Sequence, residues 1–575
     1  MLKKIFERGK KIVLEPQGSV LSAATIIMVM IIASRILGLV RQRTLAHFFT
    51  PDDLSLFFAA FRLPDLIFEV LVFGTFASAF IPVFSKSIKK GNGHAWEIAA
   101  SVLNIGLLLF AFFAILMSIF ADPIYSILSP GYTPMEREKI VGIARILFAA
   151  QGLFVVSYVL TGVLESLRHF LVPSLAPLFY NLGIILGTIL FSKDHHLMGP
   201  TIGVVVGALS HFLVQLPVAV KLGFRFRFRI KINDEVKTIG KLALPRLLEV
   251  GFLQISKIVE LFFSSLLSKA SYAYFTFGNT LQLLPVGLFG TSIAKAALPT
   301  LARDADDIEK FRKTLLSSLN QLIFLALPVS VFLIVFRVPV IRLVYGTEIF
   351  SWKATVQTGY VLSAFAVGVV FQAATSLLSR AFYAQNNTKT PVLISIISIT
   401  AIVILDFIFI NVFKFDVWGL AMAYTIGCIF QSTTLFFLLN KKYLKMSYKI
   451  LLKPFFKSLT ASATSGLVMF FILKIFDRSV WVKRLSFLTQ LESTKNLPFE
   501  KFVLDTRYTV NLLILTGVVS LIGVVVYIIT SAILRSDELG IFLNILKRTL
   551  VKRDITPIPQ KETETLAPTP TETTN

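Results

Sequence analysis

The chain has 575 residues, of which 55% are hydrophobic and only 16% are charged. A soluble protein of this size carries about a quarter charged residues. Apolar stretches long enough to cross a bilayer, roughly 20 residues each, recur from Leu21 to Leu534. The composition therefore predicts an all-α polytopic membrane protein and excludes a soluble globular domain.

The chain is strongly basic, with a formal net charge of +24. The cations are concentrated in alternate loops between the apolar stretches, which is the pattern that orients membrane proteins with their basic loops in the cytoplasm. They form no basic groove interleaved with exposed aromatic residues, so the charge indicates attraction to anionic lipid rather than to nucleic acid. Basic clusters flank both ends of the chain, and we expect both termini to be cytoplasmic.

Residues that carry enzymatic chemistry or bind metals are scarce and scattered. The single cysteine, Cys428, lies in an apolar stretch, so no disulfide or thiolate cluster forms within one chain. The six histidines show no metal-binding spacing, and the sequence has no phosphate-binding loop or nucleophile elbow. We therefore expect no enzyme activity and no cofactor other than a coupling ion.

Fourteen apolar spans are predicted in chain order. They cover residues 19–44, 53–84, 95–121, 138–165, 171–192, 199–222, 239–268, 271–301, 311–337, 354–384, 390–413, 415–440, 450–476 and 508–534. The expected organisation is a basic N-terminus (1–18), an N-lobe (19–222), a basic cytoplasmic linker (223–238), a C-lobe (239–440), two further spans (441–534) enclosing an outer loop (477–507), and a cytoplasmic tail (535–575). The Pro- and Thr-rich end of this tail is expected to be disordered from about 554.

Two distant segments resemble each other. Leu63–Ser85 reads LPDLIFEVLVFGTFASAFIPVFS, and Leu284–Ala302 reads LPVGLFGTSIAKAALPTLA. Both begin with Leu-Pro, continue with Phe-Gly-Thr and reach a second proline before the chain turns basic. Gly and Pro at matching places in two apolar segments are typical of the broken helices of transporters, whose substrate site lies between the repeats. The residues expected to break these helices are Pro64, Gly74, Pro82, Pro285 and Gly290.

A second match supports a repeat of six spans. Gly162–Pro173 and Leu378–Pro391 occupy equivalent junctions, between spans four and five and between spans ten and eleven. We therefore expect two pseudo-symmetric six-helix lobes followed by two C-terminal helices. Because six is even, both lobes begin on the same side, and the pseudo-two-fold axis is expected along the membrane normal.

Ionisable residues within the spans are the candidate site residues, because a charge at membrane depth is costly unless it is paired or hydrated. The first span holds Arg35 and Arg41 without an obvious carboxylate nearby, and the second span holds Arg62. The guanidinium group presents a planar fork that matches phosphate oxygens. These three arginines are therefore predicted to bind an anionic substrate that carries phosphate, whereas a cationic drug is not expected.

The other ionisable residues each have two interpretations. Asp65 and Glu69 lie on the same helical face as Arg62, so an internal Arg62–Asp65 ion pair is the alternative to a role in the cavity. Lys257 and Glu260 are three residues apart, so an intrahelical pair is the alternative there. The resulting candidates are Asp65, Lys257 and Lys295 for the cavity, and Glu260 and Asp406 as carboxylates that bind a coupling ion, either Na⁺ or H⁺.

Three blocks of the sequence resemble a known family. They are Ser34–Arg41 (SRILGLVR), Ala59–Asp65 (AAFRLPD) and Gly74–Pro82 (GTFASAFIP). Their order and spacing are similar to those of the MurJ (MviN) lipid II flippases, and the basic stretch Gly223–Lys231 extends the likeness. The resemblance implies the multidrug/oligosaccharidyl-lipid/polysaccharide exporter fold, with two lobes around a central cavity. It also implies that the two C-terminal helices form a groove accessible to lipid.

In that family, arginines of the first span line the cavity and engage the lipid diphosphate, and Arg35 and Arg41 match these positions. The family's sodium site maps onto Glu260 and Asp406. The sequence also departs from the family pattern, and Lys257 and Lys295 are the candidates to replace missing cations. In these departures Gln42 replaces an acidic residue, Ser55 an aspartate, Phe68 and Glu69 basic residues, Phe73 an acidic residue, and Asn279-Thr280 an Asp-Arg pair.

The resemblance and the intramembrane charges together predict a flippase that moves lipid II from the cytoplasmic to the outer leaflet of the inner membrane by alternating access. Because the sequence shows no ATP site, a membrane potential or an ion gradient is expected to drive it. The alternatives are a flippase for another polyprenyl-diphosphate-linked glycan, such as O-antigen or exopolysaccharide, and a non-transporting scaffold for the cell wall. Membrane lipids are expected partners, cell-wall synthesis enzymes are candidate partners, and nucleic acid is not expected.

Overall fold

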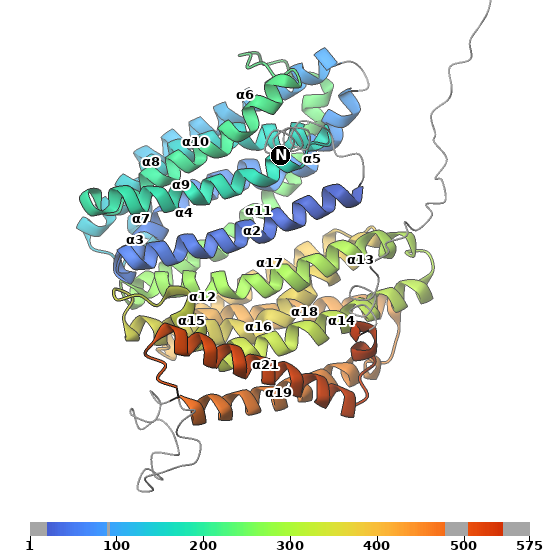
Figure 1. Ribbon diagram of the computed structural model, residues 1–575. Coiled ribbons are helices and arrows are strands. Elements are labelled where there is room, and N and C mark those ends of the chain that lie inside the picture. Colours follow the sequence, from blue (N-terminus) through green and yellow to red (C-terminus); the bar gives the residue numbers. More distant parts are fainter. Residues whose placement is uncertain (1–19, 89–91, 478–503, 544–575) are drawn as a thin grey trace, which may run out of the picture.

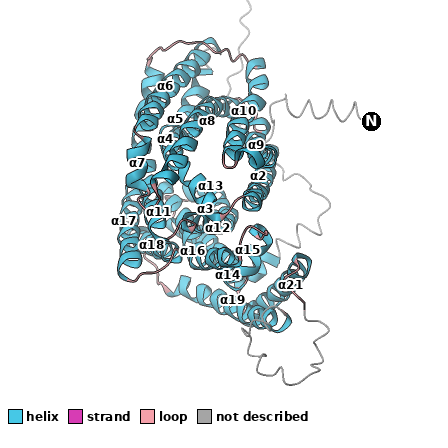
Figure 2. Ribbon diagram, turned by 90° about the vertical axis from the view of Figure 1, so that its left-hand side faces the viewer, coloured by secondary structure: helices cyan, strands magenta, loops and turns pink. Residues whose placement is uncertain are grey.

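The computed structural model describes residues 20–88, 92–477 and 504–543, and these residues are almost entirely helical (Figure 2). The described part has no β-strand and a single isolated bridge, between Asp477 and Leu504. The predicted N-terminus 1–18, most of the outer loop 477–507 and the tail from about 554 lie outside the described residues.

The elements follow one another along the chain with short connections. The first ten are α2 (Val20–Phe48), α3 (Pro51–Ala60), α4 (Arg62–Phe68), the π-helical turn η1 (Glu69–Phe73), α5 (Gly74–Ile88), α6 (Asn92–Ile119), α7 (Ala121–Leu128), α8 (Pro134–Ser166), α9 (Leu171–His195) and α10 (Met198–Lys221). The others are α11 (Asp234–Leu267), α12 (Ser271–Pro285), η2 (Val286–Thr291), α13 (Ser292–Arg303), α14 (Ile308–Val335), α15 (Arg337–Tyr345), α16 (Trp352–Ala384), α17 (Lys389–Phe407), η3 (Ile408–Val412), α18 (Trp418–Leu439), η4 (Asn440–Leu444), α19 (Lys449–Phe476) and α21 (Thr509–Ile533).

Several helices begin at side chains that cap their first free amides. Thr133 and Glu136 form a capping box at the start of α8, Asn233 caps α11 and Ser351 caps α16. Each cap supplies an oxygen to an amide that has no partner within the helix. These residues therefore fix where the long helices begin.

The helices form two groups that lie side by side (Figure 1). α3 to α10 make up the first lobe, in the upper part of that view, and α12 to α18 make up the second lobe below it. Two long helices lie between the lobes, because α2 packs against α9 and reaches α15, whereas α11 packs against α5 and α17. α19 and α21 pack on each other at the outer edge of the second lobe, where α19 contacts α14.

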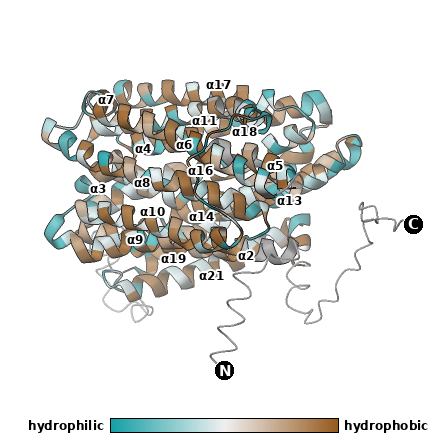
Figure 3. Ribbon diagram, turned by 90° about the horizontal axis from the view of Figure 1, so that it is seen from above, coloured by the Kyte–Doolittle hydropathy of each residue, from teal (hydrophilic) through white to brown (hydrophobic). Residues whose placement is uncertain are grey.

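The described residues include 12 helices that are long and apolar enough to cross a membrane. They coincide with predicted spans three to fourteen, and hydrophilic residues are concentrated near the helix ends (Figure 3). The all-α polytopic class predicted from composition is confirmed. The first two predicted spans are also helical, as α2 and as the broken series α3 to α5, but they are not among the twelve. The total of fourteen therefore stays a prediction.

The two repeated segments each contain a π-helical turn. η1 ends at Phe73, immediately before Gly74, and η2 begins directly after Pro285 and contains Gly290. A π turn inserts an extra residue into a helix and is frequent at functional sites. At Gly290 the absence of a side chain lets α16 approach, because a Cβ there would lie 2.7 Å from the Cα of Ala373. The repeat therefore forms the same kind of interruption in both lobes.

α9 and α10 pack backbone against backbone along two lines of glycines. A Cβ at Gly187 would lie 2.4 Å from the Cα of Gly203, and a Cβ at Gly183 would lie 2.4 Å from the Cα of Gly207. Small residues four positions apart let membrane helices approach closely and gain van der Waals contact. These two helices therefore form one tightly packed unit of the first lobe.

Replacing Gly187 with alanine is expected to destabilise the protein, because the added methyl group must push α9 and α10 apart. Overpacking of this kind costs about 1–3 kcal/mol, which should appear as a lower melting temperature of the purified protein. Gly142→Ala in α8 is the matched control, since a Cβ at Gly142 has no atom within 4 Å. Equal melting temperatures of the two variants would contradict the close packing.

The two lobes are joined at the end of the molecule where α3, α7 and α12 lie, at the left of Figure 1. Glu136, at the start of α8, forms a 2.6 Å salt bridge with Lys269, between α11 and α12. The hydrogen bond within this salt bridge and the negative charge of Glu136 raise the pKa of the Lys269 ammonium above its usual value. The Gly131 amide also donates a 3.3 Å hydrogen bond to the Ser265 hydroxyl. The first lobe is thus held against α11 and its loop at this end.

The basic linker between α10 and α11 is extended and lies against α6. The Asn104 side-chain amide donates hydrogen bonds of 2.8 and 2.9 Å to the backbone carbonyls of Arg227 and Arg229. Glu97 forms salt bridges of 3.2 Å with Arg229 and Lys231. The linker is therefore attached to the first lobe before the chain continues into α11.

Candidate functional site

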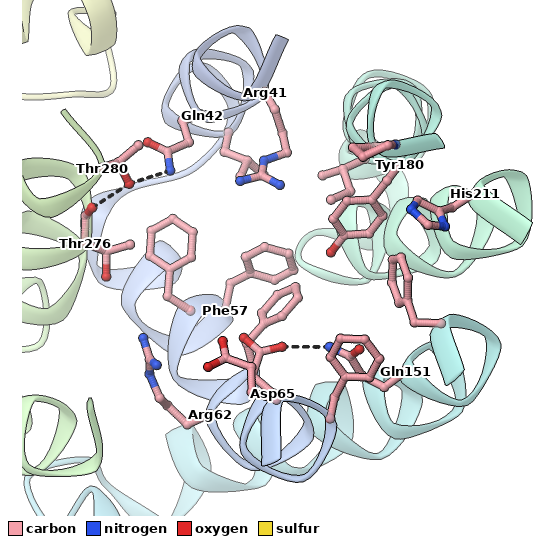
Figure 4. A pocket seen from close by; sticks show the side chains of 18 of the residues that line it. Arg41, Gln42, Phe57, Arg62, Asp65, Gln151, Tyr180, His211, Thr276 and Thr280 are labelled. Atoms are coloured by element: carbon pink, nitrogen blue, oxygen red, sulfur yellow. Dashed lines mark hydrogen bonds between the residues drawn. The ribbon is translucent and has the colours of Figure 1, made fainter. Parts of the chain in front are cut away.

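A cavity of about 470 Å³ lies among α2, α3, α4, α8, α9, α10 and α12 (Figure 4). Its charged lining consists of Arg41 from α2, Arg62 and Asp65 from α4, and Glu69 from η1. The largest group among the other lining residues is aromatic. The cavity therefore combines cations, carboxylates and aromatic rings at the boundary between the lobes.

The Arg41 guanidinium points into the cavity beside Tyr180 (Figure 4). Its Nε atom is buried and has no hydrogen-bond partner within the part of the chain that the structure describes. A buried cationic donor without an acceptor is costly. The site is therefore suited to an anion that supplies the missing oxygen atoms.

Arg62 and Asp65 line the same cavity but have separate partners. The Arg62 Nε donates a hydrogen bond to the Tyr272 hydroxyl, and the guanidinium carbon lies 5.5 Å from the centre of the Tyr272 ring. Asp65 accepts a 2.7 Å hydrogen bond from the Gln151 side-chain amide (Figure 4). Arg62 is thus oriented by α12 of the second lobe, whereas Asp65 is oriented by α8 of the first.

Lys257 contacts Glu69 across two helices rather than its neighbour Glu260. The Lys257 ammonium lies 2.7 Å from the Glu69 carboxylate, which also accepts a hydrogen bond from Gln254. The contact joins α11 to η1 at the edge of the cavity. The family pattern has a basic residue at the position of Glu69, so this chain has a carboxylate there and supplies the cation from α11.

We expect Lys257→Met and Glu69→Gln to lower the melting temperature singly, and the double variant to lose less than the sum of both effects. Removing one partner leaves a partly buried charge unpaired, whereas removing both leaves none. The coupling energy in this double-mutant cycle should be on the order of 1 kcal/mol. Lys295→Met is the control, because Lys295 is exposed on α13. Strictly additive effects would show that the two charges do not interact.

Arg35 lies in a neighbouring cavity of about 230 Å³ between α2, α9 and α12. This cavity shares Arg41, Tyr180 and Thr280 with the larger one. The Arg35 side chain is exposed, six residues before Arg41 on the same helix. The two arginines matched by the family resemblance therefore line the smaller cavity together, and Arg41 also lines the larger one.

The remaining predicted residues are spread over both lobes. Lys295 is exposed on α13 and does not line either cavity. Pro64 is buried in α4 and Pro285 at the end of α12, whereas Pro82 is exposed in α5. Gly74 is the first residue of α5, directly after η1. Pro285 and Gly74 thus flank the π turns.

Two buried carboxylates, Glu260 and Asp406, lie near each other at the contact of α11 and α17. Asp406 is 1% exposed and Glu260 is 8% exposed, and their charges interact. The Ser256 hydroxyl donates a 3.3 Å hydrogen bond to Glu260, but neither Asp406 oxygen has a hydrogen-bond partner among the described residues. Glu260 also interacts with the charge of Arg62, which connects these carboxylates to the cavity.

The unpartnered oxygens of Asp406 fit the chemistry of a hard cation, which prefers carboxylate and carbonyl oxygens. The described residues contain no group of three or more His, Cys, Asp or Glu that could hold a metal ion. A bound cation would therefore take its remaining ligands from hydroxyl, backbone or water oxygens. A proton would need only one of the carboxylates.

Two departures from the family pattern contact each other. The Gln42 amide donates a 3.0 Å hydrogen bond to the Thr280 hydroxyl and accepts one of 2.9 Å from Tyr345. The family pattern has an acidic residue at the first position and an arginine at the second, so two opposite charges are replaced together by a neutral hydrogen bond. A third departure, Ser55, accepts a 2.9 Å hydrogen bond from the Ala273 amide. These substitutions keep α2 and α3 attached to α12 without charge.

The neutral residues of the cavity are not among the site residues predicted from the sequence. Gln151, Phe154 and Tyr158 line it from α8, and Tyr180 lines it from α9. Uncharged side chains in apolar spans give no charge signal, but the spacing of i, i+3 and i+7 does place the three α8 residues on one helical face. His211 is 4% exposed and hydrogen-bonded, and it also lines the cavity.

An apolar cavity of about 320 Å³ lies between α14, α19, α21 and the helical residues 537–543. Phe324, Met469 and Tyr527 are among its lining residues. It occupies the place where the family resemblance implies a groove for lipid beside the two C-terminal helices. Its lining suits a hydrocarbon chain because almost all of the exposed surface inside it is apolar.

The fold and the cavity define a class of protein, namely a polytopic helical membrane transporter with two lobes around a cavity that holds buried charges. The family model for the lipid II flippase MurJ matches residues 44–491, which is most of the chain. The chain therefore belongs to the MurJ lipid II flippase family, as the sequence resemblance predicts.

Similar proteins and structures agree with this assignment. The chain is 28% identical over 461 residues to a probable lipid II flippase MurJ of Bdellovibrio bacteriovorus, covering 78% of this chain and 87% of that protein. It is 28% identical over 435 residues to the probable lipid II flippase MurJ of Vibrio cholerae serotype O1, and this alignment covers 72% of this chain and 82% of that protein. A solved structure of a lipid II flippase MurJ in an inward closed conformation aligns with a TM-score of 0.70 and 25% sequence identity. The alignment covers 92% of this chain and 100% of the chain in that structure. An inward-facing multidrug resistance MATE family transporter of the MOP superfamily shares the fold, with a TM-score of 0.61, 16% identity and coverage of 72% and 96%.

Proposed function

We propose that this protein moves lipid II from the cytoplasmic to the outer leaflet of the inner membrane by alternating access. The proposal is carried by Arg41, which lines the cavity and whose buried Nε has no acceptor among the residues that the structure describes. The diphosphate of lipid II offers the oxygens that a guanidinium fork binds. The similarity to proteins named as lipid II flippases supports this choice of substrate.

The arginines have different roles in this proposal. Arg35, in the neighbouring cavity, meets the head group beside the main cavity, and Arg41 then binds the diphosphate. Arg62 is held by Tyr272 of the second lobe, so its position depends on how the lobes lie relative to each other. Rocking of the lobes therefore changes the number of cations that face the diphosphate.

The polyprenyl tail stays in the bilayer while the head group crosses. The apolar cavity between α14, α19 and α21 is the candidate place for part of this tail. A head group with several hydrogen-bonding groups cannot cross hydrocarbon unaided, because each unsatisfied polar group costs several kcal/mol there. The protein thus separates a polar path between the lobes from an apolar path at its edge.

The drive for transport comes from the membrane potential or an ion gradient. Outward movement of the negatively charged diphosphate is favoured by about 2.3 kcal/mol per charge per 100 mV when the cell interior is negative. Na⁺ or H⁺ is the proposed coupling ion, and Asp406 with Glu260 is its proposed site. Because Glu260 interacts with both Asp406 and Arg62, a cation there weakens the hold of Glu260 on Arg62 and so links the ion site to the cavity.

The orientation follows from the basic loops, with both termini in the cytoplasm. A flippase for another polyprenyl-diphosphate-linked glycan is the second candidate, because the neutral Gln42–Thr280 contact gives the cavity fewer charges than the family pattern. Cell-wall synthesis enzymes are the candidate protein partners.

The proposal is tested by producing the protein in cells depleted of their own lipid II flippase. Rescue of growth and cell shape is expected, together with movement of lipid II across vesicles that contain the purified protein. Failure at normal membrane abundance, combined with movement of an O-antigen-type lipid in the same vesicles, would favour the second candidate. Movement of neither lipid would leave the scaffold alternative.

A further inference from the structure

One side of the cavity is formed by aromatic rings that phosphate binding does not use. We define the aromatic wall as Phe68, Phe154, Tyr158, Tyr180 and His211, all of which line the cavity. We propose that the aromatic wall is a sugar-binding subsite, on which the sugar bonded to the lipid diphosphate stacks. This inference rests on the proposed function, because it requires a glycan-bearing diphosphate in the cavity.

The rings of the wall are fixed against one another. The Phe154 ring centre lies 5.0 Å from those of both Tyr180 and His211, with the rings nearly edge to face. Tyr158 stacks almost parallel to His211, with 6.0 Å between ring centres and an interplanar angle of 18°, and Phe68 lies 5.3 Å from Tyr158. The five rings come from α4, α8, α9 and α10, so the wall is a composite surface within the first lobe.

Hydrogen bonds behind the wall hold it in place. His211 Nδ1 and the Ser157 hydroxyl lie 2.6 Å apart, and Gln215 donates a 2.7 Å hydrogen bond to the same hydroxyl. Thr161 donates to Gln215 over 2.9 Å. This network joins α8 to α10, and the glycine contacts join α10 to α9. The wall therefore presents a preformed surface, which lowers the entropic cost of binding a ligand.

The least buried members of the wall are two tyrosines, one of which lies beside Arg41. Tyr158 and Tyr180 are half-buried, whereas Phe68, Phe154 and His211 are buried. Tyr180 lies next to the Arg41 side chain (Figure 4). In a polyprenyl-diphosphate-linked glycan the first sugar is bonded directly to the diphosphate. A diphosphate held by Arg41 therefore places that sugar against the tyrosines.

The chemistry of the two surfaces is complementary. The face of a sugar ring presents C–H groups, and the face of an aromatic ring carries the negative part of its quadrupole, so the two attract each other. The hydroxyl groups at the edge of the sugar require polar partners. The hydroxyls of the two tyrosines and the side chain of Gln151, which line the same cavity, supply them. Phe68 stands where the family pattern has a basic residue, so this chain has a ring in place of a charge. The head group is accordingly held more by stacking and less by cations.

The test compares lipid II with polyprenyl diphosphate, which keeps the tail and the diphosphate but lacks the whole sugar-bearing head group. Binding of lipid II and of polyprenyl diphosphate without sugar is measured on the purified full-length protein. The double variant Tyr158→Leu with Tyr180→Leu keeps apolar volume but removes both stacking faces, so we expect about tenfold weaker binding of lipid II and a change below about twofold for polyprenyl diphosphate. The matched control is Tyr360→Leu with Tyr448→Leu, since these tyrosines are 46% and 42% exposed outside the cavity, and it should bind both ligands normally.

The outcomes separate the subsite from the proposed function. Equal weakening of both ligands, or no change for either, would overturn the sugar subsite. A wild-type protein that binds both ligands with the same affinity would also overturn it while leaving diphosphate transport intact. Arg41→Ala should weaken both ligands alike, and a wild-type protein that binds neither ligand would overturn the proposed function itself.

Discussion

Replacing Arg41 with alanine is expected to abolish rescue of flippase-depleted cells and to slow lipid II movement in vesicles. Removing one partner of a buried, hydrogen-bonded charge pair costs about 2–5 kcal/mol, so transport should fall by roughly 30-fold or more. The buried Nε atom supports this size of effect, because no protein group competes with the substrate for it within the described part of the chain. Arg41→Lys keeps the charge but not the planar fork, so it should give an intermediate rate.

Arg43→Ala is the matched control for this result. Arg43 lies two residues further along α2, is exposed, and donates a 2.6 Å hydrogen bond to the Leu343 carbonyl instead of lining the cavity. At equal membrane abundance it should rescue growth as the unchanged protein does. Wild-type transport by Arg41→Ala would remove the basis of the phosphate site.

Replacing Asp406 with asparagine is expected to raise the melting temperature while lowering transport at least about tenfold. The buried carboxyl group has no hydrogen-bond partner among the described residues, and an unsatisfied polar group in such surroundings destabilises the fold. A neutral amide relieves much of this cost, by about 1–3 kcal/mol. In the proposed coupling role Asp406 binds the ion, so its loss should uncouple transport from the ion gradient.

The measurement combines a melting curve with transport at two concentrations of the coupling ion. Asp416→Asn is the control, because Asp416 already accepts a 2.8 Å hydrogen bond from Gln357, and it should keep the ion dependence. A lower melting temperature for Asp406→Asn with unchanged ion dependence would instead identify Asp406 as a structural residue.

Helix positions are predictable because the bilayer imposes them. A backbone in hydrocarbon must satisfy its hydrogen bonds within one helix, so an apolar stretch of sufficient length becomes a helix. The fourth span is an example, since hydropathy places it at 138–165 and the structure at Pro134–Ser166. The difference at its start comes from Thr133 and Glu136, whose capping box extends α8 into the polar region.

Partners across helices are not predictable in this way. Spacing within one helix suggests Lys257 with Glu260, but Lys257 contacts Glu69, 188 residues away. The Gln42–Thr280 hydrogen bond joins residues 238 positions apart. Such contacts depend on which face each helix turns toward its neighbours. In a mostly apolar chain, hydropathy does not distinguish one helix face from another. The arginines could be predicted as candidate site residues because charge in the membrane is rare, whereas the aromatic wall consists of residue types that occur throughout the spans.

The glycine contacts between α9 and α10 have a consequence for the order of events during release. Helices that touch through their backbones have no side chains between them to rearrange, so Tyr180 and His211 travel together when the lobes rock. α2 packs mainly against α9, so Arg41 moves with these rings, whereas Arg62 is hydrogen-bonded to Tyr272 of α12 in the second lobe. The rings and Arg41 then keep their relative positions, and the contact of Arg62 with the diphosphate is the one that rocking changes. The diphosphate would be let go first, and the sugar would leave last.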